Sequence, residues 1–416
     1  MLKSMLTAMA GVLICFGLTA SAPVCAEESA LETVQNGNAH ASLDAESLRR
    51  QANARYTDVW LPGGVAQQFE MYDPHSAEAM TELRDMGFTQ VILDWPNLHS
   101  SATEAGLKVV MANWWTQDTK PEEIQAGIDR ARAVNPQSLV GVSLMDEPGR
   151  NAPETPFGFY IDLYEQLKPD FELDRPDTRL EISHWGPMAG WTDEFYDYFS
   201  YLYEAADVMR IMPYPDLNEG PLDDVFFMVQ RSRRLMDLAE RPLPLVVILQ
   251  AWLLPPDGKL PEIDELRAMA YQAMLSGSET VSFFEYNLDI WKQTPEFHDR
   301  FRELMQELTA FSRTYRGSRV LCRVTQDGIF TADLRTPSGR HSQLQVNTRR
   351  TPSAGYQKLE VRQFDFAEIL PITNTLQTGV GCPQQPVCFP AGLQTGCCET
   401  IDPCCVQSTR RPRRRR

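Results

Sequence analysis

Between residues 58 and 315 the chain alternates between short apolar, β-branched runs and amphipathic stretches of helical length. Such alternation is typical of parallel strands that are each followed by a covering helix. Eight runs have the composition of strands, and they span 58–61, 88–94, 108–113, 139–145, 179–184, 207–212, 243–250 and 280–285. Helical patterns follow them at 76–86, 121–133, 156–167, 192–205, 222–239, 263–275 and 295–315.

Eight strand–helix units over roughly 260 residues predict a (β/α)8 TIM barrel, which is an α/β fold. A doubly wound open sheet is the alternative, and its phosphate-binding variants carry a glycine-rich turn after an early strand. Neither G-x-G-x-x-G nor G-x-x-x-x-G-K-[ST] occurs in the chain. After residue 316 the pattern changes to brief strand-like runs at 319–324, 329–333, 343–346 and 358–361, which predict a small antiparallel β domain.

The two ends of the chain differ in composition from this central part. Residues 1–26 have a basic Lys3, an apolar run over 5–19 and a small residue at Ala26, as in a cleaved signal peptide. We therefore expect export, a leading segment or linker over 27–55, the barrel over 56–316 and the β domain over 317–371. Residues 372–416 are cysteine-rich and end in arginines; disorder, disulfides and a misassigned reading frame are all open for this tail.

Charge and hydropathy narrow the class of partner. Acidic residues number 56 against 39 basic ones, which gives a net charge of −17. A body this acidic repels phosphate backbones, so nucleic acid is not expected as a partner. No run beyond the leader is long and apolar enough for a membrane helix, and the sequence specifies no oligomeric state.

Carboxylates, amides and tryptophans gather where the predicted strands end. In a parallel barrel these ends converge on one face, so residues distant in sequence meet there. Indole rings stack on the C–H faces of sugars while polar groups bind the hydroxyls, so the pattern predicts a carbohydrate site. Packing and helix capping are the alternative roles. The first strand end is 62–64, and the expected binding residues are Asp94, Trp95, Asn113, Trp114, Asp146, His184, Trp185, Tyr214, Gln250, Trp252 and Asn287.

The most specific motif is Asp146-Glu147-Pro148, which follows the buried run 139–145. Placed at the end of the fourth strand, it resembles the Asn-Glu-Pro of clan A glycoside hydrolases and the Asp-Glu-Pro of barrels related to family 42 β-galactosidases. Residues 270–277 and 281–287 are similar to the seventh helix and eighth strand of such proteins. The resemblance implies a glycosidase in which Glu147 is the general acid/base.

Glycosidases need a second carboxylate. The resemblance places a nucleophilic glutamate at the end of the seventh strand, but this chain has Gln250 there. We expect Glu285 to supply the second carboxylate, with Asp94 and Asp216 as alternatives. Asp146 could orient Glu147, bind a sugar hydroxyl or raise the pKa of Glu147. A catalytically inactive barrel that only binds glycan is the alternative function.

Other chemistries find less support in the sequence. Ser143 lacks the second glycine of a nucleophile elbow. The six histidines are scattered without H-E-x-x-H spacing, so neither a metal nor another cofactor is expected.

Overall fold

A computed structural model describes residues 60–184, 204–215, 221–238, 241–252, 260–286, 293–349 and 362–365. All of them belong to the first of two compact units, residues 1–367. The predicted signal peptide, leading segment and cysteine-rich tail lie outside the described residues. Among those described, no helix has the length and apolar composition needed to cross a bilayer.

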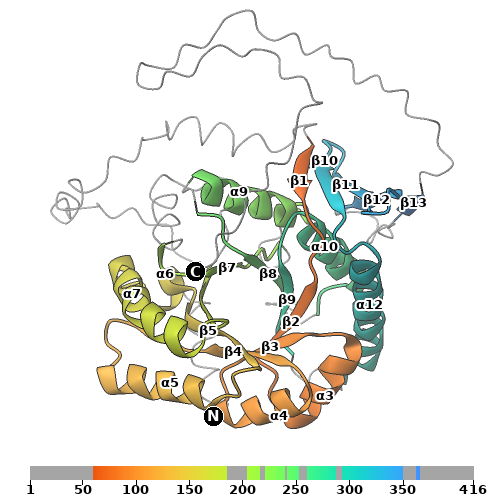
Figure 1. The fold of residues 1–416 in the computed structure, drawn as a ribbon. Helices are drawn as coiled ribbons and strands as arrows, with labels where there is room; N and C mark the ends of the chain where they lie inside the picture. The colour runs from red at the N-terminus through yellow and green to blue at the C-terminus, as the bar shows by residue number, and fades with distance from the viewer. Residues whose placement is uncertain are drawn as a thin grey trace, which may run out of the picture. The chain divides into compact units, whose positions relative to one another are not determined.

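The central feature is a closed barrel of parallel strands (Figure 1). Each strand pairs with the next along the chain, and the last pairs with the first, with Glu70 opposite Ser282. The strands are β2 (Gln68–Tyr72), β3 (Gln90–Leu93), β4 (Lys108–Ala112), β5 (Leu139–Asp146), β6 (Arg179–His184), β7 (Val208–Ile211), β8 (Leu245–Gln250) and β9 (Thr280–Phe284). The closed ring confirms the TIM barrel and excludes an open sheet.

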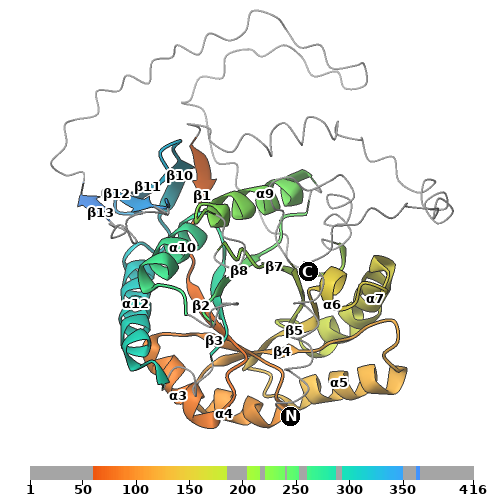
Figure 2. The same cartoon turned by 180° about the vertical axis from the view of Figure 1, so that it is seen from behind.

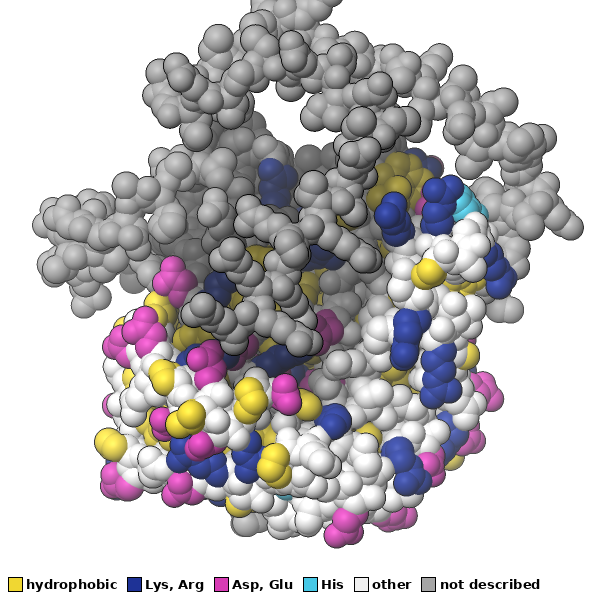
Figure 3. Space-filling view, in the orientation of Figure 1, with side chains coloured by type: hydrophobic (Ala, Val, Ile, Leu, Met, Phe, Trp, Pro, Cys, Tyr) yellow, Lys and Arg dark blue, Asp and Glu magenta, His cyan; other side chains and the backbone are white. Residues whose placement is uncertain are grey.

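Helices surround the ring on its outside, as both views show (Figures 1 and 2). They are α3 (Ala77–Met86), α4 (His99–Glu104), α5 (Pro121–Ala133), α7 (Phe157–Asp174), α9 (Asp224–Leu238), α10 (Ile263–Leu275) and α12 (Pro295–Thr314), with short turns η2 (Pro96–Leu98) and α6 (Pro148–Asn151). Ser76 begins α3 by accepting a hydrogen bond from the Ala79 N–H, and Gly87 ends it in the left-handed conformation. Charged side chains of both signs lie on the solvent faces of the described helices (Figure 3).

A separate antiparallel sheet combines one strand that precedes the barrel in sequence with four strands that follow it. Its order is β1 (Leu61–Gly63), β10 (Arg319–Val324), β11 (Ile329–Arg335), β12 (His341–Asn347) and β13 (Arg362–Asp365). The Cys322 thiol contacts the Leu275 carbonyl at 3.1 Å, and Phe330 packs on Phe226 of α9. The sheet is thus anchored to barrel helices through buried residues.

The first predicted barrel strand was wrong. The run at 58–61 leads into β1, which belongs to the antiparallel sheet, whereas the first barrel strand is β2. Gly64 donates its N–H to the Leu275 carbonyl at the end of α10, so 62–64 lie at the amino ends of the barrel strands. An alanine Cβ at Gly63 would come within 2.1 Å of that same carbonyl oxygen, which explains the glycine.

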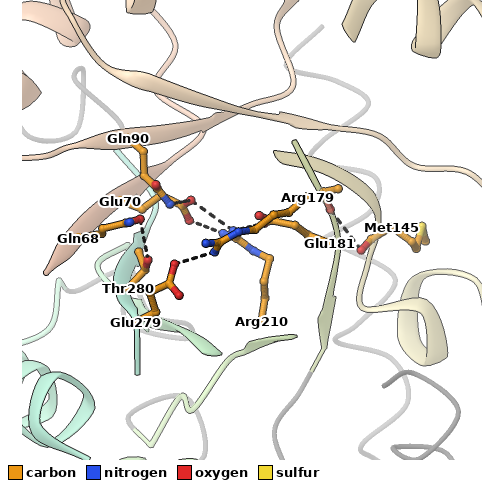
Figure 4. Close-up of polar contacts among 10 residues, drawn as sticks. Gln68, Glu70, Gln90, Met145, Arg179, Glu181, Arg210, Glu279 and Thr280 are labelled. Atoms are coloured by element: carbon orange, nitrogen blue, oxygen red, sulfur yellow. Dashed lines mark hydrogen bonds and ion pairs between the residues drawn. The ribbon is translucent and has the colours of Figure 1, made fainter. Parts of the chain in front are cut away.

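The interior of the barrel contains a buried ionic cluster (Figure 4). The Arg210 guanidinium of β7 donates to Glu181 of β6 at 2.8 Å and contacts both carboxylate oxygens of Glu70 on β2. Gln90 donates a further hydrogen bond to Glu70 at 2.8 Å. Burial raises the pKa of Glu181 to about 7, although Arg210 opposes the shift. Because buried charges are costly unless paired, the cluster binds β2, β6 and β7 to one another.

Candidate active site

The carboxyl ends of the barrel strands carry most of the predicted site residues. The described ones are Asp94, Trp95, Asn113, Trp114, Asp146, Glu147, His184, Tyr214, Gln250, Trp252 and Glu285. Since the ring is closed and all strands run the same way, these residues share one face of the barrel. Trp185, Asp216 and Asn287 lie outside the described residues.

Glu147 occupies an unusual backbone conformation directly after β5. Its φ of 49° lies in the left-handed region, which non-glycine residues seldom adopt. Its N–H donates to the Ser183 carbonyl at 2.8 Å, and Pro148 begins the short helix α6 beyond it. Strained backbone of this kind costs about 1–3 kcal/mol and is concentrated at functional sites.

The Glu147 carboxyl group is buried, with 8% of the residue exposed. Arg150 donates to Oε2 at 3.2 Å, whereas the buried Oε1 has no hydrogen-bond partner among the described residues. Burial and then the charge of Asp146 raise the pKa of Glu147 to about 8, against the opposing charge of Arg150. Glu147 is therefore predominantly protonated at neutral pH.

The neighbouring Asp146 has a lower pKa than Glu147. Burial raises its pKa to about 6, while Arg210 and the hydroxyls of Ser183 and Tyr72 act in the opposite direction. At pH 7 Asp146 is mainly ionised beside a protonated Glu147. Two adjacent carboxyl groups whose pKa values are separated by their surroundings are typical of acid–base sites.

Aromatic rings line the barrel interior beside these acids. Tyr214 packs edge-on against Trp252 with centroids 4.7 Å apart, and Trp252 packs against Phe284 at 5.2 Å. Phe284 in turn contacts Tyr72 at 5.0 Å. Burial and the charge of Glu147 raise the pKa of the Tyr214 hydroxyl, so this phenol stays neutral and able to donate.

A second group of predicted residues lines a cavity of ≈ 310 Å³ beyond β3 and β4. Asp94, Asn113 and Trp114 all contribute to its wall, together with Arg130 of α5. Trp114 is 46% exposed, which leaves much of its indole open for stacking. Burial raises the pKa of Asp94 while Arg130 lowers it. Trp95 is not among the lining residues and packs against the ring of His75 instead.

Glu285 lies close to Asp73 and His75, two residues that were not predicted to belong to the site. The possible ligand atoms of Asp73, His75 and Glu285 are all within 4.8 Å of one another. Burial raises the pKa of Glu285, and His75 opposes that shift. The peptide bond between Phe284 and Glu285 is cis. Asp73 and His75 follow β2, so they were missed because the first strand was misplaced; the unusually long interval between 61 and the helix at 76 was the available signal.

His184 and Gln250 are fully buried, so neither lies on an open surface of the site. They end β6 and β8, and 1% and 0% of their surfaces are exposed. Gln250 pairs with Phe284 in the register of β8 and β9. The neutral amide of Gln250 thus stands at the carboxyl end of the seventh barrel strand.

Comparison with known proteins gives fold likeness alone. No family model matches the chain, and no curated protein matches it. Similar solved structures include a glucosidase from Croceicoccus marinus, 13% identical with a TM-score of 0.47, covering 73% of this chain and 82% of the other. A family 51 α-L-arabinofuranosidase from Bifidobacterium longum is 10% identical, with a TM-score of 0.45 and coverage of 74% and 93%.

An endo-β-1,4-mannanase from Thermotoga petrophila is 11% identical, with a TM-score of 0.43 and coverage of 74% of this chain and 92% of the other. Likeness at these values carries no argument about activity, because one barrel fold supports many chemistries. The function has to be inferred from the side chains of the site.

Proposed function

We propose that this protein hydrolyses glycosidic bonds at the carboxyl face of its barrel, with Glu147 as the proton donor. The observation that carries the proposal is the buried Glu147 carboxyl group, protonated at neutral pH and with Oε1 unengaged by the described residues. A general acid must hold a proton at the working pH and present it to the leaving oxygen. The raised pKa of Glu147 supports the first requirement, and its unengaged Oε1 at the carboxyl end of β5 supports the second.

The second carboxylate is proposed to be Glu285. In a closed ring of eight strands, β5 and β9 are four positions apart, so Glu147 and Glu285 follow strands on opposite sides of the barrel. Carboxyl groups about 6.5–9.5 Å apart leave room for a water molecule and invert the anomeric configuration, whereas closer pairs retain it. We propose inversion, with Glu285 as the base that activates water, because Gln250 leaves the end of the seventh barrel strand without a nucleophilic carboxylate.

The remaining polar and aromatic groups would bind the sugar. Trp114 offers an exposed indole face, and Asp94 and Asn113 offer hydrogen-bonding groups in the same cavity. Asp146, ionised beside Glu147, can accept a hydrogen bond from a sugar hydroxyl. The stacking face and polar groups of this cavity, whose lining does not include Glu147, suit a pyranose or furanose ring bound as a neighbouring subsite.

The test is hydrolysis of a panel of 4-nitrophenyl glycosides and plant and bacterial polysaccharides, monitored by nitrophenol release and new reducing ends. We expect turnover by the wild type, with kcat/KM falling as pH rises above about 8, where Glu147 loses its proton. Glu147→Gln and Glu285→Gln should each lower kcat by at least about 100-fold. Glu154→Gln, at an exposed site in the same loop between β5 and α7 as Glu147, is the matched control.

Carbohydrate binding without turnover is the second candidate, and Gln250 favours it. An amide at the end of the seventh barrel strand cannot act as a nucleophile or base, so a retaining mechanism has no carboxylate there. This candidate predicts that glycans raise the melting temperature while no reducing ends form. Measurable turnover abolished by Glu147→Gln would eliminate it.

A further inference from the structure

Three side chains from opposite ends of the barrel sequence meet beside the mouth. Asp73 and His75 follow the first barrel strand, β2, and Glu285 follows the last, β9. These two strands pair directly where the ring closes. We propose that Asp73, His75 and Glu285 form a binding site for a divalent transition-metal ion.

The spacing of the three groups suits a single ion. Their ligand atoms lie within 4.8 Å of one another. Carboxylate oxygens and imidazole nitrogens bind such ions at about 2.0–2.2 Å, so two ligands of one ion stand roughly 3–4 Å apart. Small rotations of the side chains would close the remaining difference.

A second observation, independent of the spacing, is the state of Asp73. This residue is only 8% exposed, and its Oδ1 has no hydrogen-bond partner among the described residues. The Asp94 backbone N–H and the Trp95 indole lie close enough to favour the ionised form of Asp73, but neither forms a hydrogen bond with Oδ1. A buried oxygen without a donor is costly unless a cation or water engages it.

The charges around the cluster also favour a cation. No lysine or arginine of the described residues forms an ion pair with Asp73 or Glu285, and the imidazole of His75 is 3.9 Å from the Asp73 carboxylate. Two carboxylates are thus gathered with one histidine as their nearest potential positive charge. A divalent ion would neutralise both carboxylates at once.

The backbone holds the ligands in place before any ion arrives. Asp73 has a φ of 46°, and its N–H donates to the Ile92 carbonyl at 2.8 Å. Tyr286, next to Glu285, is hydrogen-bonded to Glu82 of α3 at 2.5 Å. Asp73 and Glu147 are the two non-glycine residues with positive φ in the described chain, and both are acids at strand ends.

The ligand set indicates the class of ion. One imidazole nitrogen with two carboxylates suits Zn²⁺, Mn²⁺ or Fe²⁺ better than Ca²⁺, which prefers six to eight oxygen ligands. Three protein ligands leave a coordination position for water or substrate. His75 is partly exposed and provides a route for the ion to enter.

Occupancy of this site would affect hydrolysis. An ion that coordinates Glu285 withdraws it from activating water, so the bound metal should inhibit turnover. That expectation rests on the function proposed for Glu285, whereas the binding itself rests on the three side chains alone.

The test is a titration of the full chain with Mn²⁺ in the presence of excess Mg²⁺, which occupies all-oxygen sites. Binding is measured as the loss of the electron paramagnetic resonance signal of free Mn²⁺. Mn²⁺ is preferred to Zn²⁺ because the cysteines of the tail would bind zinc. The variants are His75→Ala and Asp73→Asn, and the matched control is His341→Ala on β12.

The expected result is one Mn²⁺ per chain, with affinity at least about tenfold weaker in both variants and unchanged in the control. Circular dichroism of the metal-free variants checks their folding. If Asp73→Asn does not fold, Mn²⁺ binding by His75→Ala decides the question, because the His75 side chain is partly exposed and its loss disturbs the fold less. Absence of a stoichiometric site, or equal binding by His75→Ala and wild type, would overturn the proposal. Neither outcome depends on whether the protein hydrolyses glycosides.

Discussion

At the scale of single residues, the site depends on how two neighbouring carboxyl groups share protons. Asp146 and Glu147 are both buried, but Arg210 and two hydroxyls favour the ionised form of Asp146. Glu147 has only the partly exposed Arg150 to stabilise its charge. The proton therefore resides on Glu147, the residue whose Oε1 remains available.

The raised pKa of Glu147 has a consequence for stability. Its pKa is about 8 in the folded protein and near 4.5 when unfolded, so the folded state binds more protons between these values. Folding stability then falls as pH rises through this window, by roughly 4–5 kcal/mol from this group. Glu147→Gln removes the effect, so its stability relative to wild type should increase from pH 5 to 8.

Urea unfolding of both proteins across this pH range measures the difference, and Glu154→Gln should track the wild type. A constant difference between Glu147→Gln and wild type would show that Glu147 titrates normally. It would remove the protonated carboxyl group on which the proposed acid role depends.

At the scale of elements, the loop after β9 is fixed from outside the barrel. The Tyr286 hydroxyl donates to Glu82 Oε2 at 2.5 Å, and Glu82 Oε1 contacts Arg302 and, at 2.8 Å, His298 of α12. Helices α3 and α12 therefore hold the residue that follows Glu285. This bond orients a site residue without touching the site itself.

Tyr286→Phe should lower kcat by roughly tenfold and cost about 1–3 kcal/mol of stability, because a hydrogen bond to a carboxylate is lost. The matched control is Tyr271→Phe, which removes a similar 2.9 Å bond to Glu307 between α10 and α12. Its stability loss should be comparable while kcat is unchanged. Equal effects of the two variants on kcat would assign Tyr286 a purely structural role.

Seven of the eight barrel strands could be predicted because each has several β-branched or other apolar residues and fits the strand–helix alternation of the sequence. The first could not, since β2 reads Gln-Phe-Glu-Met-Tyr with Glu70 facing inward. Glu70 is tolerated there only because Arg210, 140 residues later in the chain, pairs with it. Such a long-range pair has no local signature, and the error concealed Asp73 and His75 as well. The Asp146-Glu147-Pro148 motif, by contrast, was visible because it ends a long and mostly apolar strand.

At the scale of the whole molecule, the Glu70–Arg210–Glu181 cluster joins distant parts of the barrel. Arg210→Met would leave two buried carboxylates without a positive partner, at a cost of about 3–5 kcal/mol. Arg179→Met is the matched control, because Arg179 pairs with Glu279 at 2.6 Å near the surface. Exposed pairs contribute about 1 kcal/mol or less. Denaturant unfolding measures both losses of stability. Equal losses for Arg210→Met and Arg179→Met would show that the buried cluster contributes no more than a surface ion pair.

The most direct test of the central claim compares leaving groups. Wild type, Glu147→Gln and Glu154→Gln are assayed on 2,4-dinitrophenyl and phenyl glycosides of the sugar that the panel identifies. If Glu147 protonates the leaving oxygen, Glu147→Gln should retain much of its kcat/KM on the dinitrophenyl glycoside, whose leaving group needs no proton, and lose at least about 100-fold on the phenyl glycoside. The account is contradicted if Glu147→Gln loses both activities equally, or loses neither.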